Sequence, residues 1–367
     1  MALPFGKRIA FSAIATGISI LVIGIVAEIF LRIRYENIAQ ITGVTEWQIS
    51  ERGLLTYRWD QYHPRYGWTN RPGYRSDDRL PFRLTINERG LRGERDPLPN
   101  PAPGIQRILL FGDSLAFGED VNDTETVARY LEGSLSNTEV LNFGVHGYGL
   151  GQMMLRLEDE AFALNPDHIL VMVMVPRDLS RDQMPHFVHA KPVFGLRDGQ
   201  LVVSNVPVPT ASRLPWLYRH CFLAALLFGP AAEEFVVDDA RPDIRVEQKL
   251  LQRIRERAER EGVPLTLVSV SNAYDLLRLE SQPGGRDALD AIRSALALPE
   301  LDVLDLIDFL EARVAAEGRM LATKSWHWSP RGNCLISERI ADHLSQADSP
   351  WVRQSDTPAC PPTQRRH

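Results

Sequence analysis

The stretch RILLFGDSL, from Arg107 to Leu115, decides the fold of this chain. Its apolar residues run directly into a Gly-Asp-Ser turn, which is typical of a buried strand that ends at a sharp bend before a helix. Such a turn holds a serine hydroxyl outward at the edge of a sheet, with the following backbone N–H groups facing an anion. Ser114 is therefore a candidate nucleophile. The alternative is that it caps the next helix, a common role for serine, and the turn alone favours neither.

Apolar runs alternate with helical segments after this turn. We expect strands at 108–111, 140–143, 168–175, 265–270 and 301–306. We expect helices at 124–135, 150–164, 244–261, 286–298 and 332–346. This alternation predicts an α/β fold with a doubly wound parallel sheet, whose ligands bind at the carboxyl ends of the strands, where Ser114 falls.

Composition excludes several classes of protein. The chain has 367 residues, 44% of them hydrophobic, which is enough for one large core. Its net charge is −6 with no long run of one sign, so we expect no nucleic-acid partner. Cys221, Cys334 and Cys360 lie far apart without metal-ligand spacing, so we expect no zinc site and no disulfide framework. A single Cys221–Cys334 bridge stays open.

The N-terminal segment has the length of a membrane span. Residues 9–27 carry no charge and would extend roughly 28 Å as a helix, close to the hydrocarbon thickness of a bilayer. Lys7 and Arg8 precede the segment and Arg32 and Arg34 follow it, so the positive-inside comparison is close to a tie. We favour a single-span anchor over a cleaved signal peptide and over a buried core helix.

The predicted organisation has four parts, each with its own composition. They are an anchor at 1–35 with its span at about 9–31, an extracytoplasmic lead-in at 36–103, a main domain at 104–347 and a disordered tail at 348–367. Residues 184–243 hold many prolines and no clear period, and we interpret them as an insertion in the main domain that could cover the site.

Two further loops follow predicted strands. NFGVHGYGLGQ, at 142–152, contains Gly144, whose N–H could approach an oxyanion, although the loop could also be only a tight turn. WHWSPRGN, at 326–333, contains His327, which could accept the proton of Ser114, although a histidine between tryptophans is more often a packing residue.

The ordered landmarks FGDSL, NFGVHGYGLGQ and HWSPRGN resemble those of SGNH/GDSL-type hydrolases, in the branch with an N-terminal membrane anchor. The resemblance covers about 84–346, including INERGLRGE. It implies a flavodoxin-like three-layer sandwich, with Ser114 as nucleophile and His327 as base. It also implies an oxyanion hole made by the N–H groups of Ser114 and Gly144 and by an Asn side chain. We expect no cofactor and no metal ion.

The chain departs from the family pattern at two places. Arg177 stands where the family has its Asn, and its five donors and permanent charge could serve the oxyanion instead. Lys324 and Ser325 stand where an acid should orient His327. A backbone carbonyl, Ser325, or one of three carboxylates could replace that acid: Asp302, Asp305 and Asp308. We also expect Arg177–Asp178 and Arg181–Asp182 to be surface ion pairs.

The sequence thus predicts an ester hydrolase or acyl transferase that uses Ser114 and His327 on O-acylated carbohydrate or a cell-envelope lipid. The alternative is a degenerate, non-catalytic domain that binds glycan or an envelope partner. We expect the protein in the cell membrane as a single-pass protein, with its main domain on the extracytoplasmic side, which is the periplasm in a Gram-negative cell.

Overall fold

The computed structural model describes residues 5–34, 59–78, 80–208, 217, 220–228, 243–279, 285–346, 349–355 and 360–362. Five parallel strands form the central sheet: β3 (Gln106–Gly112), β4 (Thr138–Asn142), β5 (His168–Met174), β8 (Leu265–Val270) and β9 (Asp302–Asp305). Their spatial order is β4-β3-β5-β8-β9, the 2-1-3-4-5 order of flavodoxin-like folds. The predicted fold class is confirmed, and all five expected strands are present.

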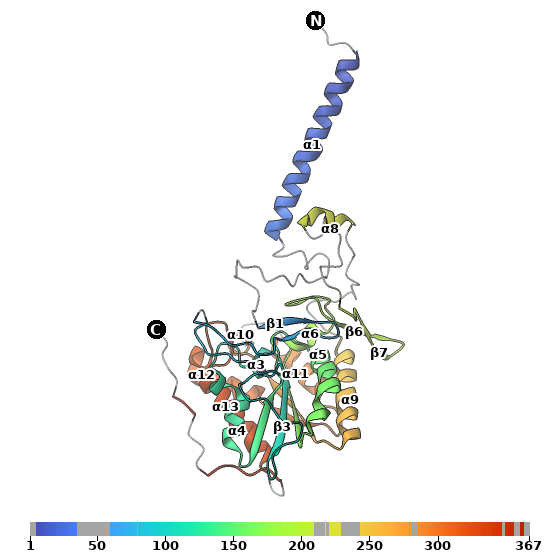
Figure 1. Ribbon diagram of the computed structural model, residues 1–367. Helices are drawn as coiled ribbons and strands as arrows, with labels where there is room; N and C mark the ends of the chain where they lie inside the picture. The colour runs from blue at the N-terminus through green and yellow to red at the C-terminus, as the bar shows by residue number, and fades with distance from the viewer. Residues whose placement is uncertain are drawn as a thin grey trace.

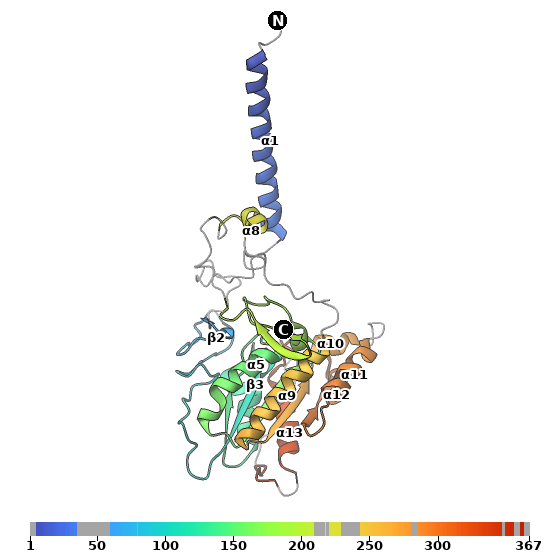
Figure 2. The same cartoon turned by 90° about the vertical axis from the view of Figure 1, so that its right-hand side faces the viewer.

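Helices cover both faces of the sheet, as Figures 1 and 2 show. On one face α4 (Val127–Ser134) packs against α13 (Pro330–Leu344), and on the other α9 (Ile244–Glu261) packs between α5 (Leu150–Arg156) and α11 (Gly285–Leu296). The short helix α3 (Ser114–Phe117) begins at the serine turn. In the described part of the sheet domain three further helices were not expected from the sequence: α6 (Arg177–Arg181), α10 (Ala273–Arg278) and α12 (Ile307–Glu317). The middle strand β5 is buried over its whole length, as its continuous apolar run predicts.

The described part of the lead-in belongs to the sheet domain. It forms an antiparallel hairpin of β1 (Asp60–His63) and β2 (Gly67–Asn70). Trp68 is fully buried in the main core, and its Nε1 donates to the carbonyl oxygen of His146 at 3.0 Å. Asn70 donates to the carbonyl oxygen of Gly144 at 3.0 Å. The hairpin therefore supports the loop that carries Gly144.

The described part of the insertion divides into two pieces. One is an antiparallel hairpin of β6 (Val193–Arg197) and β7 (Gln200–Ser204), which packs on α9. The other is α8 (Phe222–Phe228), which packs on the N-terminal helix α1 (Phe5–Arg34), away from the sheet domain in Figure 1. The hypothesis that the insertion covers the site stays a prediction.

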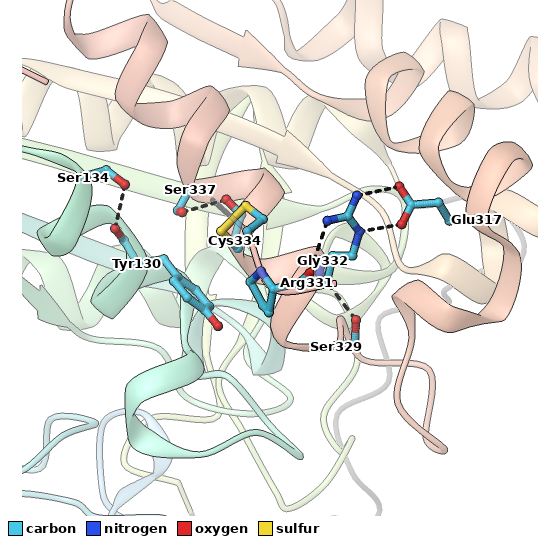
Figure 3. The surroundings of a disulfide bond; sticks show 10 residues. Tyr130, Ser134, Glu317, Ser329, Arg331, Gly332, Cys334 and Ser337 are labelled. Atoms are coloured by element: carbon cyan, nitrogen blue, oxygen red, sulfur yellow. Dashed lines mark hydrogen bonds and ion pairs between the residues drawn. A yellow bond between two sulfur atoms is a disulfide. The ribbon is translucent and has the colours of Figure 1, made fainter. Parts of the chain in front are cut away.

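The tail closes onto the domain through a disulfide bond between Cys334 and Cys360, drawn in Figure 3. Trp351 is buried, and the N–H of Ser136 donates to the carbonyl oxygen of Val352 at 2.8 Å. The Cys221–Cys334 bridge that the sequence left open is not formed, since Cys221 is a free thiol. The expectation of a disordered tail does not hold for its described part, which is packed. Sequence spacing carried no signal for this pairing because α13 brings Cys334 to the tail only in the folded chain.

Cys360→Ser is expected to lower the free energy of unfolding by about 3–4 kcal/mol, because the bridge closes a loop with a sequence separation of 26 in the unfolded chain. Chemical denaturation of the full chain, followed by circular dichroism, measures this difference. Cys221→Ser is the matched control, and we expect it to change the unfolding free energy much less. Equal stability of Cys360→Ser and the unmodified chain would contradict a bridge that stabilises the fold.

Candidate active site

The Gly-Asp-Ser turn depends on two of its residues: Gly112, which has no room for a Cβ atom, and Asp113, whose carboxylate caps α3. A Cβ atom on Gly112 would lie 2.5 Å from the Cβ of Ala116 and 2.9 Å from the carbonyl oxygen of Met172. Asp113 caps α3, since its Oδ1 accepts from the N–H of Leu115 at 2.9 Å. The cap of this helix is therefore Asp113 and not Ser114, so the capping alternative for Ser114 was wrong.

The structure brings Ser114 and His327 into contact although they lie near opposite ends of the domain's sequence. Their Oγ and Nε2 atoms lie 3.0 Å apart, as the sequence hypothesis requires. The histidine loop is closed by the N–H of Thr323, which donates to the carbonyl oxygen of His327 at 2.8 Å. Trp328 is buried beneath this loop. The loop geometry therefore holds the imidazole ring over the serine.

The acid that sequence reasoning did not find is Asp120. Its Oδ2 lies 3.0 Å from Nδ1 of His327, on the opposite side of the ring from Ser114. The same oxygen accepts from Thr323 Oγ1 at 2.9 Å and from the hydroxyl of Ser325. Ser325 Oγ itself lies 3.0 Å from Nδ1, so the residue at the family's acid position joins His327 to a carboxylate from another loop.

The three carboxylates expected from neighbouring strand ends have other partners. Asp302 pairs with His343 at 2.9 Å. Asp305 and Asp308 both pair with Arg293, at 2.6 and 3.0 Å. These carboxylates do not contact His327, so the suggestion that one of them orients its ring was wrong. The carboxylate beside the ring is Asp120.

Charge around the imidazole favours its protonated form. Burial alone would lower the pKa of His327, but the hydrogen bond to Asp120 and the nearby carboxyl groups of Glu119 and Asp113 outweigh burial and raise it. Burial would raise the pKa of Asp120, but the hydrogen bonds from His327 and Ser325 lower it. Asp120 is thus a carboxylate that stabilises an imidazolium, as a base that takes a serine proton requires.

Gly144 lies directly against α3. A Cβ atom there would be 2.3 Å from the backbone nitrogen of Phe117, so only glycine permits this approach. Its N–H donates to Oδ1 of Asn142 at 2.9 Å, and Asn142 Nδ2 donates to the carbonyl oxygen of Ala116 at 2.7 Å. The structure therefore brings Gly144 beside the helix that starts with Ser114.

Arg177 is not brought to Ser114. Its guanidinium makes a bidentate ion pair with Asp275, through Nε and Nη2 at 2.6 Å each, and its side chain is half-exposed. That pairing raises the pKa of Arg177 and uses two of its donors. The expected place of Arg177 in the oxyanion site has no contact to support it in the described part of the chain.

Arg181 and its carboxylate partners are buried, so the expectation of surface ion pairs here was wrong. Arg181 Nη1 donates to Asp113 Oδ2 at 3.1 Å and to Asp178 Oδ1 at 2.6 Å. Asp182 is also buried, and its Oδ1 accepts from the N–H of Gly151 at 2.9 Å. Arg181 therefore fixes the residue that caps α3, and acts as a positioning residue for the serine turn.

Among the residues that the structure describes, two groups of side chains have the geometry to hold a metal ion. In one, ligand atoms of Glu119, Asp120 and His327 all lie within 4.8 Å of one another. Both ring nitrogens of His327 already make the contacts to Ser114 and Asp120 described above, so an ion there would compete with the serine. The other group contains Cys334 and Cys360, whose sulfurs are joined in the disulfide.

Solved structures with a similar fold come from esterases and lipolytic proteins. A member of the lipolytic protein G-D-S-L family from Veillonella parvula DSM 2008 is 16% identical with a TM-score of 0.40, covering 66% of this chain and 99% of that chain. The lipase/acylhydrolase from Enterococcus faecalis is 15% identical with a TM-score of 0.38, covering 65% and 95%. The acetyl xylan esterase AlAXEase is 14% identical with a TM-score of 0.41, covering 65% and 99%.

No protein-family model matches the sequence, and no curated protein matches it. The fold of this chain is described from its own strand order, and its chemistry is inferred from the contacts of its own site.

Proposed function

We propose that this chain is an SGNH-type ester hydrolase or acyl transferase that works through Ser114, His327 and Asp120. The observation that carries the proposal is the continuous hydrogen-bonded series from Ser114 Oγ to His327 Nε2 and from His327 Nδ1 to Asp120 Oδ2, with 3.0 Å at each step. A serine, a base and an acid that orients the base form the arrangement that activates a hydroxyl for attack on an acyl carbonyl.

The proposed reaction has two halves. His327 takes the proton of Ser114 as Oγ attacks the ester carbonyl, and then gives that proton to the alcohol oxygen as the ester bond breaks. The acyl group stays on Ser114 until water or a second hydroxyl attacks it, with His327 again moving the proton. We assign the N–H of Ser114 to the oxyanion, and leave Arg177 out because Asp275 holds its guanidinium. The N–H of Gly144 donates to Asn142 Oδ1 at 2.9 Å, so it can serve the oxyanion only by giving up that bond.

The substrate class that we propose is O-acylated carbohydrate or a cell-envelope lipid. The proposal rests on the family resemblance and on the N-terminal helix, which would keep the domain at a membrane where such esters occur. The non-catalytic alternative was motivated by the missing acid next to His327 and by Arg177 at the family's Asn position. The first motive no longer holds, because Asp120 Oδ2 lies 3.0 Å from Nδ1 of the ring. The second motive stands, because Arg177 pairs with Asp275, and the probe experiment below decides between the two functions.

A fluorophosphonate probe tests whether the hydroxyl is activated. The unmodified chain should be labelled, and the labelled peptide should contain Ser114. Ser114→Ala should show no label, and so should the unmodified chain after heat denaturation. The hydrogen bond by which Asp113 caps α3 should be kept in the serine variant. Alanine is therefore preferred to a larger residue, which could displace Asp113. Failure of the folded chain to label, or labelling at another serine, would overturn the proposal.

We further propose that α1 anchors the chain with its sheet domain outside the cytoplasm. Residues Phe11–Arg34 form one continuous helix, which contains an 18-residue stretch with a mean hydropathy of 2.4, of which 6% is buried. A signal sequence can share these properties. Helix α8 packs beside its end, where the N–H of Leu223 donates to Glu28 at 2.8 Å, and it exposes Leu227 and Phe228. These apolar surfaces, and a disulfide typical of oxidising compartments, support this topology.

Protease added to intact spheroplasts is expected to remove the sheet domain and to leave a membrane-bound fragment that contains α1. Carbonate extraction should leave the undigested chain in the membrane pellet, because an uncleaved apolar helix holds it there. A cytoplasmic marker protein of the same cells is the control for intact membranes. Protection of the sheet domain from protease would contradict the topology, and its recovery in the soluble fraction would contradict the anchor.

A further inference from the structure

The carboxyl group of Glu119 faces His327 and takes no part in the mechanism above. Its side chain is 9% exposed, and Oε2 lies 3.7 Å from Nε2 of His327, beyond hydrogen-bond distance. Its N–H donates to the carbonyl oxygen of Ser114 at 3.1 Å, so the residue is tied to the nucleophile turn. Within the part of the chain that the structure describes, this carboxyl group has no hydrogen-bond partner.

The position of Glu119 identifies the side of the site that it serves. Nε2 of His327 is the atom that takes the proton of Ser114 and gives it to the oxygen of the departing alcohol. That alcohol oxygen must therefore come within hydrogen-bond distance of Nε2. A carboxyl oxygen 3.7 Å from the same atom adjoins the alcohol rather than the oxyanion, which faces backbone N–H groups.

The contact of Glu119 with His327, at 3.7 Å, is an ion pair only while the ring is protonated. A buried carboxyl group without a hydrogen bond is costly, and a ligand can supply that hydrogen bond. Burial raises the pKa of Glu119, and the neighbouring carboxylates of Asp120 and Asp60 raise it further, while His327 and His146 lower it. A hydroxyl group can satisfy either form of the side chain, since it donates to a carboxylate and accepts from a carboxylic acid. A simple alkyl or aryl alcohol offers no such second hydroxyl.

We propose that Glu119 forms the alcohol subsite of the enzyme and binds a hydroxyl group next to the ester oxygen of the substrate. The preferred alcohol is then a polyol, such as a sugar or glycerol, both as the leaving group and as the acceptor in acyl transfer. This inference rests on the proposed function and narrows its substrate class. In the transfer step a polyol hydroxyl gives its proton to His327, its oxygen bonds to the acyl carbon, and the proton passes to Ser114 as the acyl–serine bond breaks.

The test compares an acetate ester whose alcohol carries free hydroxyl groups with one whose alcohol carries none. Glycerol monoacetate has a hydroxyl beside the ester oxygen, and ethyl acetate has none. Glu119→Ala in the full chain should lower kcat/KM for glycerol monoacetate about 10- to 100-fold more than for ethyl acetate, the range expected for losing one hydrogen bond to a buried carboxyl group. Glu119→Gln should keep most of the preference, because an amide still binds a hydroxyl.

Two controls make the outcomes distinct. Glu300→Gln changes an exposed carboxylate and should leave the ratio unchanged. Each ratio is measured on one preparation, so it does not depend on the fraction that is folded. If Glu119→Ala slows both esters equally, or slows neither, the alcohol subsite is overturned while the esterase stands. If the unmodified chain hydrolyses neither ester and Ser114→Ala behaves identically, the proposed function itself has failed.

A second measurement uses the acyl-enzyme. With p-nitrophenyl acetate as donor, glycerol and 1-propanol compete with water for the acyl group on Ser114. The amounts of glycerol ester, propyl ester and free acetate give the share of acyl groups that each acceptor takes. Glu119→Ala should lower the glycerol share about tenfold relative to the 1-propanol share. An unchanged ratio of the two transfer products would overturn the subsite.

Discussion

Asp120→Asn is expected to lower kcat/KM for p-nitrophenyl acetate about 10⁴-fold, because losing the acid of a serine triad leaves the imidazole in the wrong tautomer. Asp120 Oδ2 accepts from Nδ1 of His327 at 3.0 Å, and an amide in its place could present an N–H to the same nitrogen. Nε2 would then carry the proton and could no longer take the proton of Ser114. Steady-state kinetics of the full chain and the variant measure the loss.

The pH dependence of the same variant gives a second readout. The hydrogen bond to Asp120 raises the pKa of His327, and the ring must be neutral to act as a base. Activity should therefore fall as the pH drops through that raised pKa. In Asp120→Asn the residual activity should persist to lower pH, because the charge that raised the pKa has gone. If Asp120 had only a structural role, its replacement would not shift the acidic side of the pH–activity profile to lower pH.

Asp308→Asn is the matched control, because it removes a carboxylate whose recorded partners are Arg286 and Arg293 rather than His327. We expect its kcat/KM to stay close to that of the unmodified chain. A loss in Asp120→Asn no larger than that in Asp308→Asn would show that His327 works without an acid. The chain would then use a serine–histidine pair alone.

The sheet and the serine–histidine pair could be predicted from the sequence because their signals are local. The buried strand β5 appears as the apolar run HILVMVM, and Ser114 follows directly on the apolar run of β3. In a doubly wound fold the carboxyl ends of the strands meet at one edge, so two loops that leave this edge can be placed near each other without coordinates. His327 belongs to such a loop, so the topology places it at the same edge of the sheet as Ser114, and the structure gives the 3.0 Å between them.

Asp120 could not be predicted in this way because its role depends on backbone conformation. It lies in a loop after α3 with a left-handed backbone, φ +68°, which turns the side chain back toward the histidine loop. Nothing in the letters GED specifies that turn. The available signal was Ser325 at the position of the missing acid, since a hydroxyl there needs an acceptor. Thr323, two residues earlier, supplies a second hydroxyl to the same carboxylate.

The burial of charged side chains near the serine turn was the second feature that the sequence did not predict. The sequence predicts that Arg177 pairs with Asp178 and Arg181 with Asp182 at the surface. In the structure Arg181 pairs with Asp178 instead, and both side chains are buried near the serine turn. Their burial follows from the way α6 packs under the carboxyl edge of the sheet, which spacing alone does not show. Such pairs are costly to bury and strongly destabilising when only one partner is removed. Here Arg181 also reaches Asp113, which links the buried charge to the shape of the site.

Ser114→Ala and His327→Ala are each expected to lower kcat for p-nitrophenyl acetate on the order of 10⁴- to 10⁶-fold, and the double variant should lose no more than the larger single loss. The reason is that the two groups act as one unit: the hydroxyl is a weak nucleophile without the base, and the base has no proton to take without the hydroxyl. The 3.0 Å contact between Oγ and Nε2 is the structural basis for this coupling.

The double-mutant comparison separates a working pair from two residues that merely touch. If the losses multiply, the side chains contribute independently, and the serine is not activated by the histidine. If all three variants match the unmodified chain, hydrolysis comes from background reaction and the site is silent. Arg339→Ala, on the outer part of α13 where Arg339 pairs with Asp342 at 3.7 Å, is the control for general damage. Non-additive loss with an unaffected control is the result that only a serine–histidine unit explains.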